Sequence, residues 1–139
     1  MRLVPYASSD QAEVIELWHR CELTRPWNDP VKDIARKLTE QPELFLVGKL
    51  DNRIVATAMA GFDGHRGWVN YLAVDPNHRK KGLGRTLMQH IEEAMKARGC
   101  PKLNIQVRTG NSEAIEFYRK LGYVPDEAVS LGKRLIPDT

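Results

Sequence analysis

The spacing of hydrophobic residues predicts two helices early in the chain, after a short strand at residues 2–6. In two stretches the apolar residues recur with the period of an amphipathic helix. Ser8 or Ser9 is placed to cap the first helix, whereas Asp29 and Pro30 suit the N-cap and the first position of the second. The two apolar faces are formed by Val14, Leu17, Trp18 and Cys21, and by Val31, Ile34, Ala35 and Leu38.

From Glu43 onward the hydrophobic pattern changes to the alternation that is typical of strands. Apolar runs at residues 43–50, 53–62 and 68–74 are separated by the short turn sequences "DN" and "DGHRG". Neighbouring strands joined by tight turns pair antiparallel, because the chain has no room for a crossover. This part of the sequence therefore predicts an antiparallel meander.

Beyond Pro76 the pattern alternates between the helical and the strand period. Glycines follow both helical stretches, where a left-handed residue commonly ends a helix. The predicted elements are a helix from Leu83 to Gly99, a strand at 102–107, a helix from Asn111 or Ser112 to Gly122, and a final strand at 128–136. The order predicts a single domain over residues 1–139, of mixed α/β type with a mostly antiparallel sheet and about four helices.

The composition indicates a globular domain, since 42% of the residues are hydrophobic and 28% are charged. The apolar runs are too short to cross a bilayer, and the N-terminus has no apolar stretch long enough for a signal peptide. We therefore expect a cytoplasmic protein that does not act on membranes. Cys21 and Cys100 lack the spacing of metal ligands, so we expect no metal and interpret both as core residues. The oligomeric state is left open, a homodimer included.

The segment "HRKKGLGRTL", residues 78–87, has the features of a phosphate-binding loop. Basic residues precede two glycines and a helix start, where backbone N–H groups and the helix dipole favour an anion. A Cβ at Gly82 or Gly84 would hold the anion away from the backbone or require a disfavoured φ. The Walker pattern is absent, and the dinucleotide fingerprint lacks its third glycine. The net charge of +3 permits an anionic ligand but does not by itself indicate nucleic acid.

The pattern Arg-x-x-Gly-x-Gly at residues 79–84 resembles the loop that binds the pyrophosphate of coenzyme A in the GNAT superfamily of N-acetyltransferases. The resemblance continues in "YLAVDPNHRKKGLG" and "NSEAIEFYRKLGY" and covers essentially the whole chain. It implies two central strands, here 68–74 and 102–107, that splay apart around the pantetheine arm of acetyl-CoA. The implied cofactor-binding residues are Leu72, Ala73, Val74, Arg79, Lys80, Lys81, Gly82, Leu83, Gly84, Arg85, Asn111 and Tyr118.

The resemblance also implies how an acetyl group would be transferred. Main-chain groups of Leu72 and Val74 bind the arm, with the Leu72 amide near the thioester carbonyl as an oxyanion-type donor. Tyr118 stands at the family's position for the acid that protonates the departing thiolate, although its place on an apolar helix face equally suits a core tyrosine. Asn111 suits a helix cap at least as well as a ligand contact.

The sequence does not identify a general base. Many members of the family carry a glutamate near the start of the strand that holds Leu72, whereas this chain has Asn70, which cannot take a proton at neutral pH. The alternatives are Asp63, His65, Glu22, Asp29 or a chain of water molecules, and each carboxylate is better explained as a turn or cap residue. We expect the acceptor over residues 21–29 and the hairpin, with Trp27 either forming a wall or packing its loop.

The leading hypothesis is an acetyl-CoA-dependent N-acetyltransferase that acts on a primary amine by direct attack in a ternary complex. The amine belongs to a small molecule, a protein or a peptide. An alternative is a catalytically idle acyl-CoA-binding sensor, which the missing strand carboxylate motivates. A nucleic-acid-binding domain is disfavoured, because no recognition-helix motif or basic surface interleaved with aromatic residues occurs.

Overall fold

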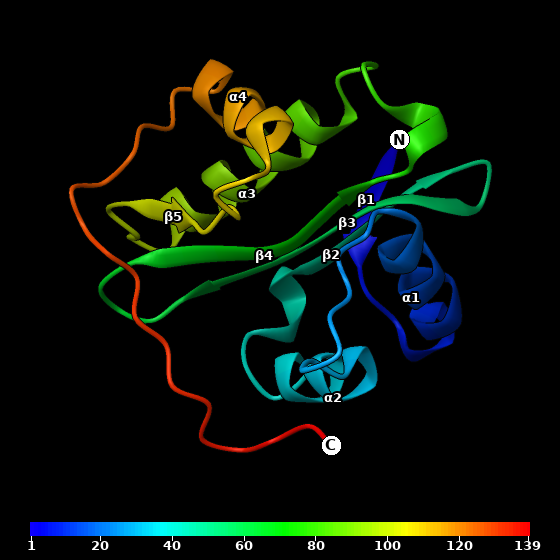
Figure 1. The fold of residues 1–139 in the computed structure, drawn as a ribbon. Helices are drawn as coiled ribbons and strands as arrows, with labels where there is room; N and C mark the ends of the chain where they lie inside the picture. Colours follow the sequence, from blue (N-terminus) through cyan, green and yellow to red (C-terminus); the bar gives the residue numbers. More distant parts are fainter.

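A computed structural model describes residues 1–139 and arranges them as a five-stranded sheet with helices packed on both faces (Figure 1). The strands are β1 (Arg2–Pro5), β2 (Phe45–Leu50), β3 (Arg53–Phe62), β4 (Gly67–Val74) and β5 (Leu103–Ile105), and the helices are α1 (Gln11–Arg20), α2 (Pro30–Lys37), α3 (Leu83–Ala97) and α4 (Ser112–Lys120). The strands lie side by side in chain order, and only β4 and β5 are parallel. That parallel pair needs a crossover, which α3 supplies.

The sheet separates two apolar cores. α1 and α2 cover one face, where Trp18 and Phe45 are fully buried, and α3 and α4 cover the other, where Leu87 and Ile91 are fully buried (Figure 1). β3 contributes to both cores, because residues 54–60 are buried whichever face they point to. A strand covered on both faces needs a nearly continuous apolar run, which explains why "IVATAMA" alternates so weakly. None of the helices is both long and apolar enough to cross a membrane.

Most helix ends lie where the local sequence predicts them. The Asp29 carboxylate accepts the Val31 amide at 2.9 Å and caps α2, which begins at Pro30. Gly99 and Gly122 have φ of +82° and +97° and follow the last residues of α3 and α4. These ends depend on only a few neighbouring residues, so the local pattern is enough to predict them.

The cap predicted for the first helix is wrong. Ser8 and Ser9 lie inside a short 3-10 turn that precedes α1, and neither hydroxyl caps it. The Asp10 carboxylate instead reaches back and accepts the Ala7 amide at 2.9 Å. Asp10 is itself buried and pairs with Lys49, which lies on β2, at 3.3 Å. No side chain caps the first turn of α1, and the Asp10 carboxylate closes the turn before it instead.

The meander is confirmed, with a two-residue turn at Asp51 and Asn52 whose φ values are +50° and +64°. β4 and β5 pair only as far as Val69 and Ile105, so residues 70–74 of β4 have no strand on that side. This is the implied splay. β5 is shorter than the predicted strand at 102–107, however, and it lies at the edge of the sheet, so the splayed pair is not central.

The final strand predicted at residues 128–136 does not form, although its apolar residues alternate. Val129 and Leu131 are 85% and 90% exposed. The segment is held at both ends by side chains: Asp126 accepts Lys102 at 2.6 Å beside β5, and Asp138 binds residues of α2. Between these anchors Gln106, which follows β5, donates to the Ser130 hydroxyl, and the chain then leads across to α2 (Figure 1) without forming a main-chain ladder with β5.

Asp138 is the anchor at the α2 end, and its side chain is only 1% exposed. Its carboxylate accepts the Arg36 guanidinium at 2.6 Å and the Asp29 amide at 2.7 Å, while its carbonyl accepts Lys32 at 2.8 Å. The Arg36 hydrogen bond, with the Asp29 amide, lowers the pKa of Asp138 to about 2. A carboxylate with a lowered pKa stabilises the folded state only while it is ionised.

Replacing Asp138 with asparagine is therefore expected to release this anchor and to lower the protection of the Asp29 amide against hydrogen exchange at neutral pH. In the unmodified protein the same protection is expected to fall between the ordinary aspartate pKa, about 3.9, and the lowered value of about 2. Asp126→Asn removes a carboxylate at the other anchor and is the control. If Asp29 keeps its protection in Asp138→Asn, the carboxylate does not hold the segment.

Candidate functional site

The loop that joins β4 to α3 is fixed at its start by Asp75, which is buried. The carboxylate accepts the Asn77 amide at 2.9 Å and the Arg20 guanidinium at 2.8 Å. Burial alone would raise the pKa of Asp75, but these two donors hold it below the ordinary value. The carboxylate thus stays ionised and binds α1 to the beginning of the loop.

The two glycines of the loop have different roles. Gly82 has a φ of +78° and is the N-cap of α3, and a Cβ built on it would meet no atom within 4 Å. Gly84 is buried inside the first turn, where a Cβ would lie 3.0 Å from Cζ of Phe117. The missing side chain at Gly84 therefore lets α3 and α4 approach closely, while contact of its backbone with an anion stays a prediction.

Positive charge gathers around this helix start without carboxylate partners. Arg79, Lys80, Lys81 and Arg85 are all exposed, and none of them takes part in an ion pair. α1, α2 and α4 each have an acidic residue in the first turn, whereas α3 has none. Helix dipoles favour negative charge at this position. The N-terminus of α3 thus carries positive charge that no carboxylate of the protein pairs with.

The predicted cofactor residues of β4 lie directly before this loop. Leu72 and Val74 pack on the α3 side of the sheet, and Ala73 is buried opposite Thr57 of β3. The Val74 carbonyl already accepts the Cys21 thiol at 3.3 Å and Nε of Arg79 at 3.2 Å. A carbonyl has two lone pairs, so a ligand could bind this oxygen only by displacing one of these donors.

Tyr118 lies on the inner side of α4, among aromatic rings. Its ring meets Phe117 and Tyr123 edge to face, with centroids 5.0 Å and 5.9 Å away. Tyr123 is fixed in turn by a hydrogen bond of 2.5 Å to Glu92. Burial raises the pKa of Tyr118, so its phenol stays protonated at neutral pH. Because Phe117 contacts Gly84, the residue next to Tyr118 is packed on the first turn of α3.

Asn111 and Leu83 occupy the two helix starts on this face. The Asn111 side-chain oxygen accepts the Ala114 amide at 3.1 Å, so the predicted capping role is confirmed and its NH2 group is the part left for a ligand. Leu83 is half-buried as the first residue of α3. No group of three histidine, cysteine, aspartate or glutamate side chains is close enough together to hold a metal ion.

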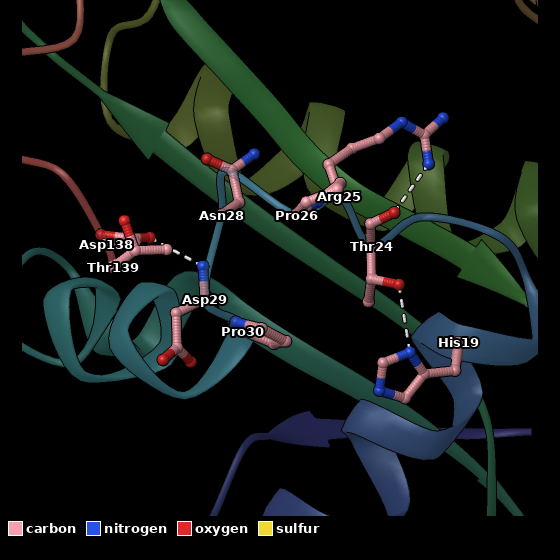
Figure 2. A pocket seen from close by; sticks show the side chains of 9 residues that line it. All are labelled: His19, Thr24, Arg25, Pro26, Asn28, Asp29, Pro30, Asp138 and Thr139. Carbon is pink, nitrogen blue, oxygen red and sulfur yellow. Dashed lines mark hydrogen bonds between the residues drawn. The ribbon is translucent and has the colours of Figure 1, made fainter.

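A polar cavity of about 420 Å³ lies at the loop between α1 and α2, away from the loop that joins β4 to α3. Figure 2 shows its lining, with the C-terminal residues beside Asn28 and Asp29, and with His19 directed at Thr24. Nδ1 of His19 is 3.0 Å from the Thr24 hydroxyl. The residues that line it are His19, Thr24, Arg25, Pro26, Asn28, Asp29, Pro30, Asp138 and Thr139.

Trp27 extends from the same loop and is 52% exposed. The guanidinium carbon of Arg108, which follows β5, lies 5.6 Å from the centre of its ring. This cation–π contact connects the loop between α1 and α2 with the loop between β5 and α4. Trp27 therefore stands between the two loops and is not packed into a core.

The structure gives two of the proposed bases, Asp63 and Asp29, a structural task. Asp63 accepts the His65 and Arg66 amides at 2.8 Å and 2.7 Å, and these bonds lower its pKa. Asp29 is occupied in capping α2, and Glu22 sits at a left-handed position with φ +58°. A carboxylate with a lowered pKa is a poorer base, so Asp63 is disfavoured on electrostatic grounds as well.

Three side-chain hydrogen bonds near Leu72 were not predicted. Thr57 accepts the Trp18 indole N–H at 2.8 Å and donates to the Tyr71 carbonyl at 3.0 Å. The Tyr71 hydroxyl donates to Asp33 at 2.6 Å. A threonine inside the otherwise apolar run "IVATAMA" was a visible signal, because a buried hydroxyl requires partners.

Comparison with known proteins shows which family the chain resembles. A model of the acetyltransferase (GNAT) family matches residues 12–123. An acetyltransferase of Yersinia enterocolitica is 49% identical over 138 residues, which are 99% of this chain and 98% of the relative. Escherichia coli ribosomal-protein-S18-alanine N-acetyltransferase has a TM-score of 0.72 at 25% identity and covers 87% of this chain and 76% of its own.

A second solved structure extends the likeness of fold over nearly the full length. AAC(6')-Iy, in complex with the bisubstrate analogue CoA-S-monomethyl-acetylneamine, has a TM-score of 0.78 at 13% identity and covers 97% of this chain and 98% of its own. At that identity the likeness concerns the fold alone. The family match and the close relative carry the assignment, and the chain belongs to the GNAT family of acetyltransferases.

Proposed function

We propose that the protein transfers the acetyl group of acetyl-CoA to a primary amine. The observation that carries the proposal is the start of α3, where four exposed cations and a left-handed glycine surround a helix N-terminus with no acidic residue. Such a position favours a pyrophosphate, through both its amides and its charge. The CoA bisubstrate analogue bound by AAC(6')-Iy, a protein of the same fold, supports this choice of ligand.

The pantetheine arm is proposed to lie where β4 and β5 part. Residues 70–74 of β4 have no strand on that side, and an extended arm with two amides pairs well with such a backbone. The loop binds the pyrophosphate at one end through Arg79, Lys80, Lys81, Gly82 and Arg85, with Leu83 and Asn111 beside it. The Leu72 amide then donates to the thioester carbonyl, as in an oxyanion hole.

In the proposed reaction the amine nitrogen attacks the thioester carbon and forms a tetrahedral intermediate. The intermediate collapses as the C–S bond breaks, and Tyr118 gives its phenolic proton to the departing thiolate. The proton lost by the amine passes to solvent, from which Tyr118 is protonated again. Atoms and charge balance, and the products are the acetylated amine and free coenzyme A.

The acceptor is proposed to enter from the loop between α1 and α2, beside Trp27. The polar cavity there has no large apolar residue in its lining, which favours a hydrophilic amine. Of the two solved structures of similar fold described above, one is a ribosomal-protein-S18-alanine N-acetyltransferase and the other contains a CoA–acetylneamine bisubstrate analogue. We therefore include both protein amines and small-molecule amines as candidate acceptors. We further propose that the reaction takes place in the cytoplasm.

The test of this function is release of coenzyme A thiol from acetyl-CoA, measured over a panel of polyamines, aminoglycosides and peptides with free N-termini. The expected result is release that requires one class of amine, with the acetylated amine identified by mass spectrometry. If the protein does not bind acetyl-CoA in calorimetry, the proposal is wrong from its first step.

An idle acyl-CoA sensor is the second candidate, and one specific observation favours it. Asn70 replaces the family's glutamate, and Asp63 and Asp29 are engaged in a turn and a cap. Such a sensor would bind acetyl-CoA tightly and would acetylate no amine in the panel. An enzyme without a dedicated base would still turn over with amines that are partly neutral at the assay pH, and its rate would rise with pH.

Replacing Arg79 with alanine is expected to weaken acetyl-CoA binding roughly tenfold or more, since a hydrogen bond to a charged group contributes about 1.5–3 kcal/mol. The loss should be larger at low salt than at high salt, because ions screen exposed charges. Calorimetry at two salt concentrations measures both effects, with Lys133→Ala as a control that removes an exposed charge elsewhere. A loss that salt does not change would assign Arg79 only to its bond with the Val74 carbonyl.

A further inference from the structure

Thr57 is fully buried in the middle of β3, and its hydroxyl has a defined direction. The Trp18 indole nitrogen, a donor only, is 2.8 Å away, so the Thr57 oxygen must accept that hydrogen bond. The single hydroxyl hydrogen is then left for the Tyr71 carbonyl at 3.0 Å. α1 thereby orients a hydroxyl on β3, which in turn binds one particular peptide group of β4.

That peptide group lies in a β-bulge. Thr57 is opposite Ala73 and Met59 is opposite Asn70, so Ala58 faces both Tyr71 and Leu72. Tyr71 has a φ of +52°, which is costly for a bulky residue and needs support from its surroundings.

Two further contacts hold the bulge. The Tyr71 ring stacks on Trp18 with centroids 3.9 Å apart, and its hydroxyl donates to Asp33 on α2 at 2.6 Å. The distortion is therefore fixed from both helices of that face, and Trp18 of α1 acts twice, through its ring on Tyr71 and through its N–H on Thr57. An element that the surroundings hold so firmly is suited to aim a backbone group accurately.

The direction of the Leu72 amide follows from the geometry of the peptide. The carbonyl of residue 71 and the N–H of residue 72 belong to one planar trans unit and point in opposite directions. Because Thr57 binds the carbonyl from β3, the Leu72 N–H points away from β3. On that side β4 has no strand partner beyond Val69, and this is where the proposed function places the thioester.

We infer that Thr57, oriented by Trp18, is a positioning residue that aims and strengthens the Leu72 amide toward the thioester carbonyl of acyl-CoA. A hydrogen bond to the carbonyl end of a peptide polarises its N–H, so the chain from Trp18 through Thr57 to Tyr71 makes the amide a better donor. The inference rests on the proposed function, and it adds residues of α1 and β3 that touch neither substrate.

The test compares Thr57→Val, which keeps the shape and removes the hydroxyl, with Thr57→Ser, which keeps the hydroxyl. Carbonyl-labelled acetyl-CoA is bound to each protein, and the thioester carbonyl stretch is recorded by isotope-edited infrared spectroscopy, with no acceptor present. A strong donor moves this stretch to lower frequency. We expect a low-frequency stretch in the unmodified protein and in Thr57→Ser, and a return toward the free value in Thr57→Val.

Turnover supplies the second readout. Removing an oxyanion donor outright costs about 10²–10³ in kcat, so misdirecting it should cost Thr57→Val roughly tenfold to hundredfold. The KM for acetyl-CoA should hardly change, because the loop and the arm are untouched, and Thr57→Ser should restore kcat. Thr39→Val is the matched control, since the exposed Thr39 hydroxyl also donates to a backbone carbonyl, that of Arg36 at 2.7 Å, away from β4.

Thermal unfolding of each variant separates this role from simple loss of structure. If Thr57→Val does not fold, Trp18→Phe replaces it, because it removes the N–H that orients the hydroxyl and keeps an aromatic ring against Tyr71; the stretch should then return part of the way. A folded variant with the native stretch and native kcat would overturn the inference alone. If the unmodified protein binds no acetyl-CoA, the proposed function fails first and the inference fails with it.

Discussion

Replacing Gly82 with valine is expected to abolish binding of acetyl-CoA while the fold is kept. The residue has a φ of +78°, a region that a β-branched side chain hardly adopts. The loop must therefore change its backbone, which turns away the amides at the start of α3, or keep it with the valine side chain in the open space where the pyrophosphate is proposed to bind. Strain of about 1–3 kcal/mol is small beside an ordinary folding stability of about 5–15 kcal/mol.

The matched control is Gly99→Val, at the other end of the same helix. Gly99 has a φ of +82°, and a Cβ there likewise meets no atom within 4 Å, so the substitution creates a similar backbone strain. It leaves the loop untouched and should preserve the Kd for acetyl-CoA in isothermal titration calorimetry. Native affinity in Gly82→Val would remove this loop from the binding site, whereas equal losses in both variants would mean that strain in α3, and not the loop, weakens binding.

Sequence patterns predicted the elements whose formation depends on neighbouring residues. The cap at Asp29, the left-handed glycine after α3 and the meander from β2 to β4 all follow from a few adjacent side chains, and all are confirmed. The unpaired cations of the loop could be located in the same way. The sequence could not show that these cations lack carboxylate partners, because ion pairing depends on which distant segments fold nearby.

The failures have a common cause, since each depends on contacts between distant parts of the chain. Residues 128–136 alternate like a strand, but their two anchors lie beside β5 and on α2. The packing of Phe117 against Gly84 was not predicted, because it joins two helices that are distant in sequence. Thr57 reads as part of an apolar run, and only the fold brings Trp18 and the Tyr71 carbonyl to its hydroxyl.

Tyr118→Phe is the substitution that separates an enzyme from a sensor, and it is expected to lower kcat by about 10²-fold. A positioned general acid contributes roughly 10²–10⁴. The lower end applies here for two reasons. A thiolate is a tolerable leaving group at neutral pH. Burial also raises the pKa of the Tyr118 phenol, which weakens it as an acid toward a thiolate while keeping it protonated.

Binding of acetyl-CoA should hardly change in Tyr118→Phe, because the ring still packs against Phe117 and Tyr123 and the hydroxyl acts mainly in the transition state. The control is Tyr123→Phe, which removes a hydroxyl that is bound to Glu92 and is not assigned to the reaction. Steady-state kinetics with the amine found in the panel give kcat and KM for both variants. Full turnover in Tyr118→Phe would make Tyr118 a core residue. Tight acetyl-CoA binding by the unmodified protein with no acetylated amine at all would establish the sensor instead, because the phenol would then have no thiolate to protonate.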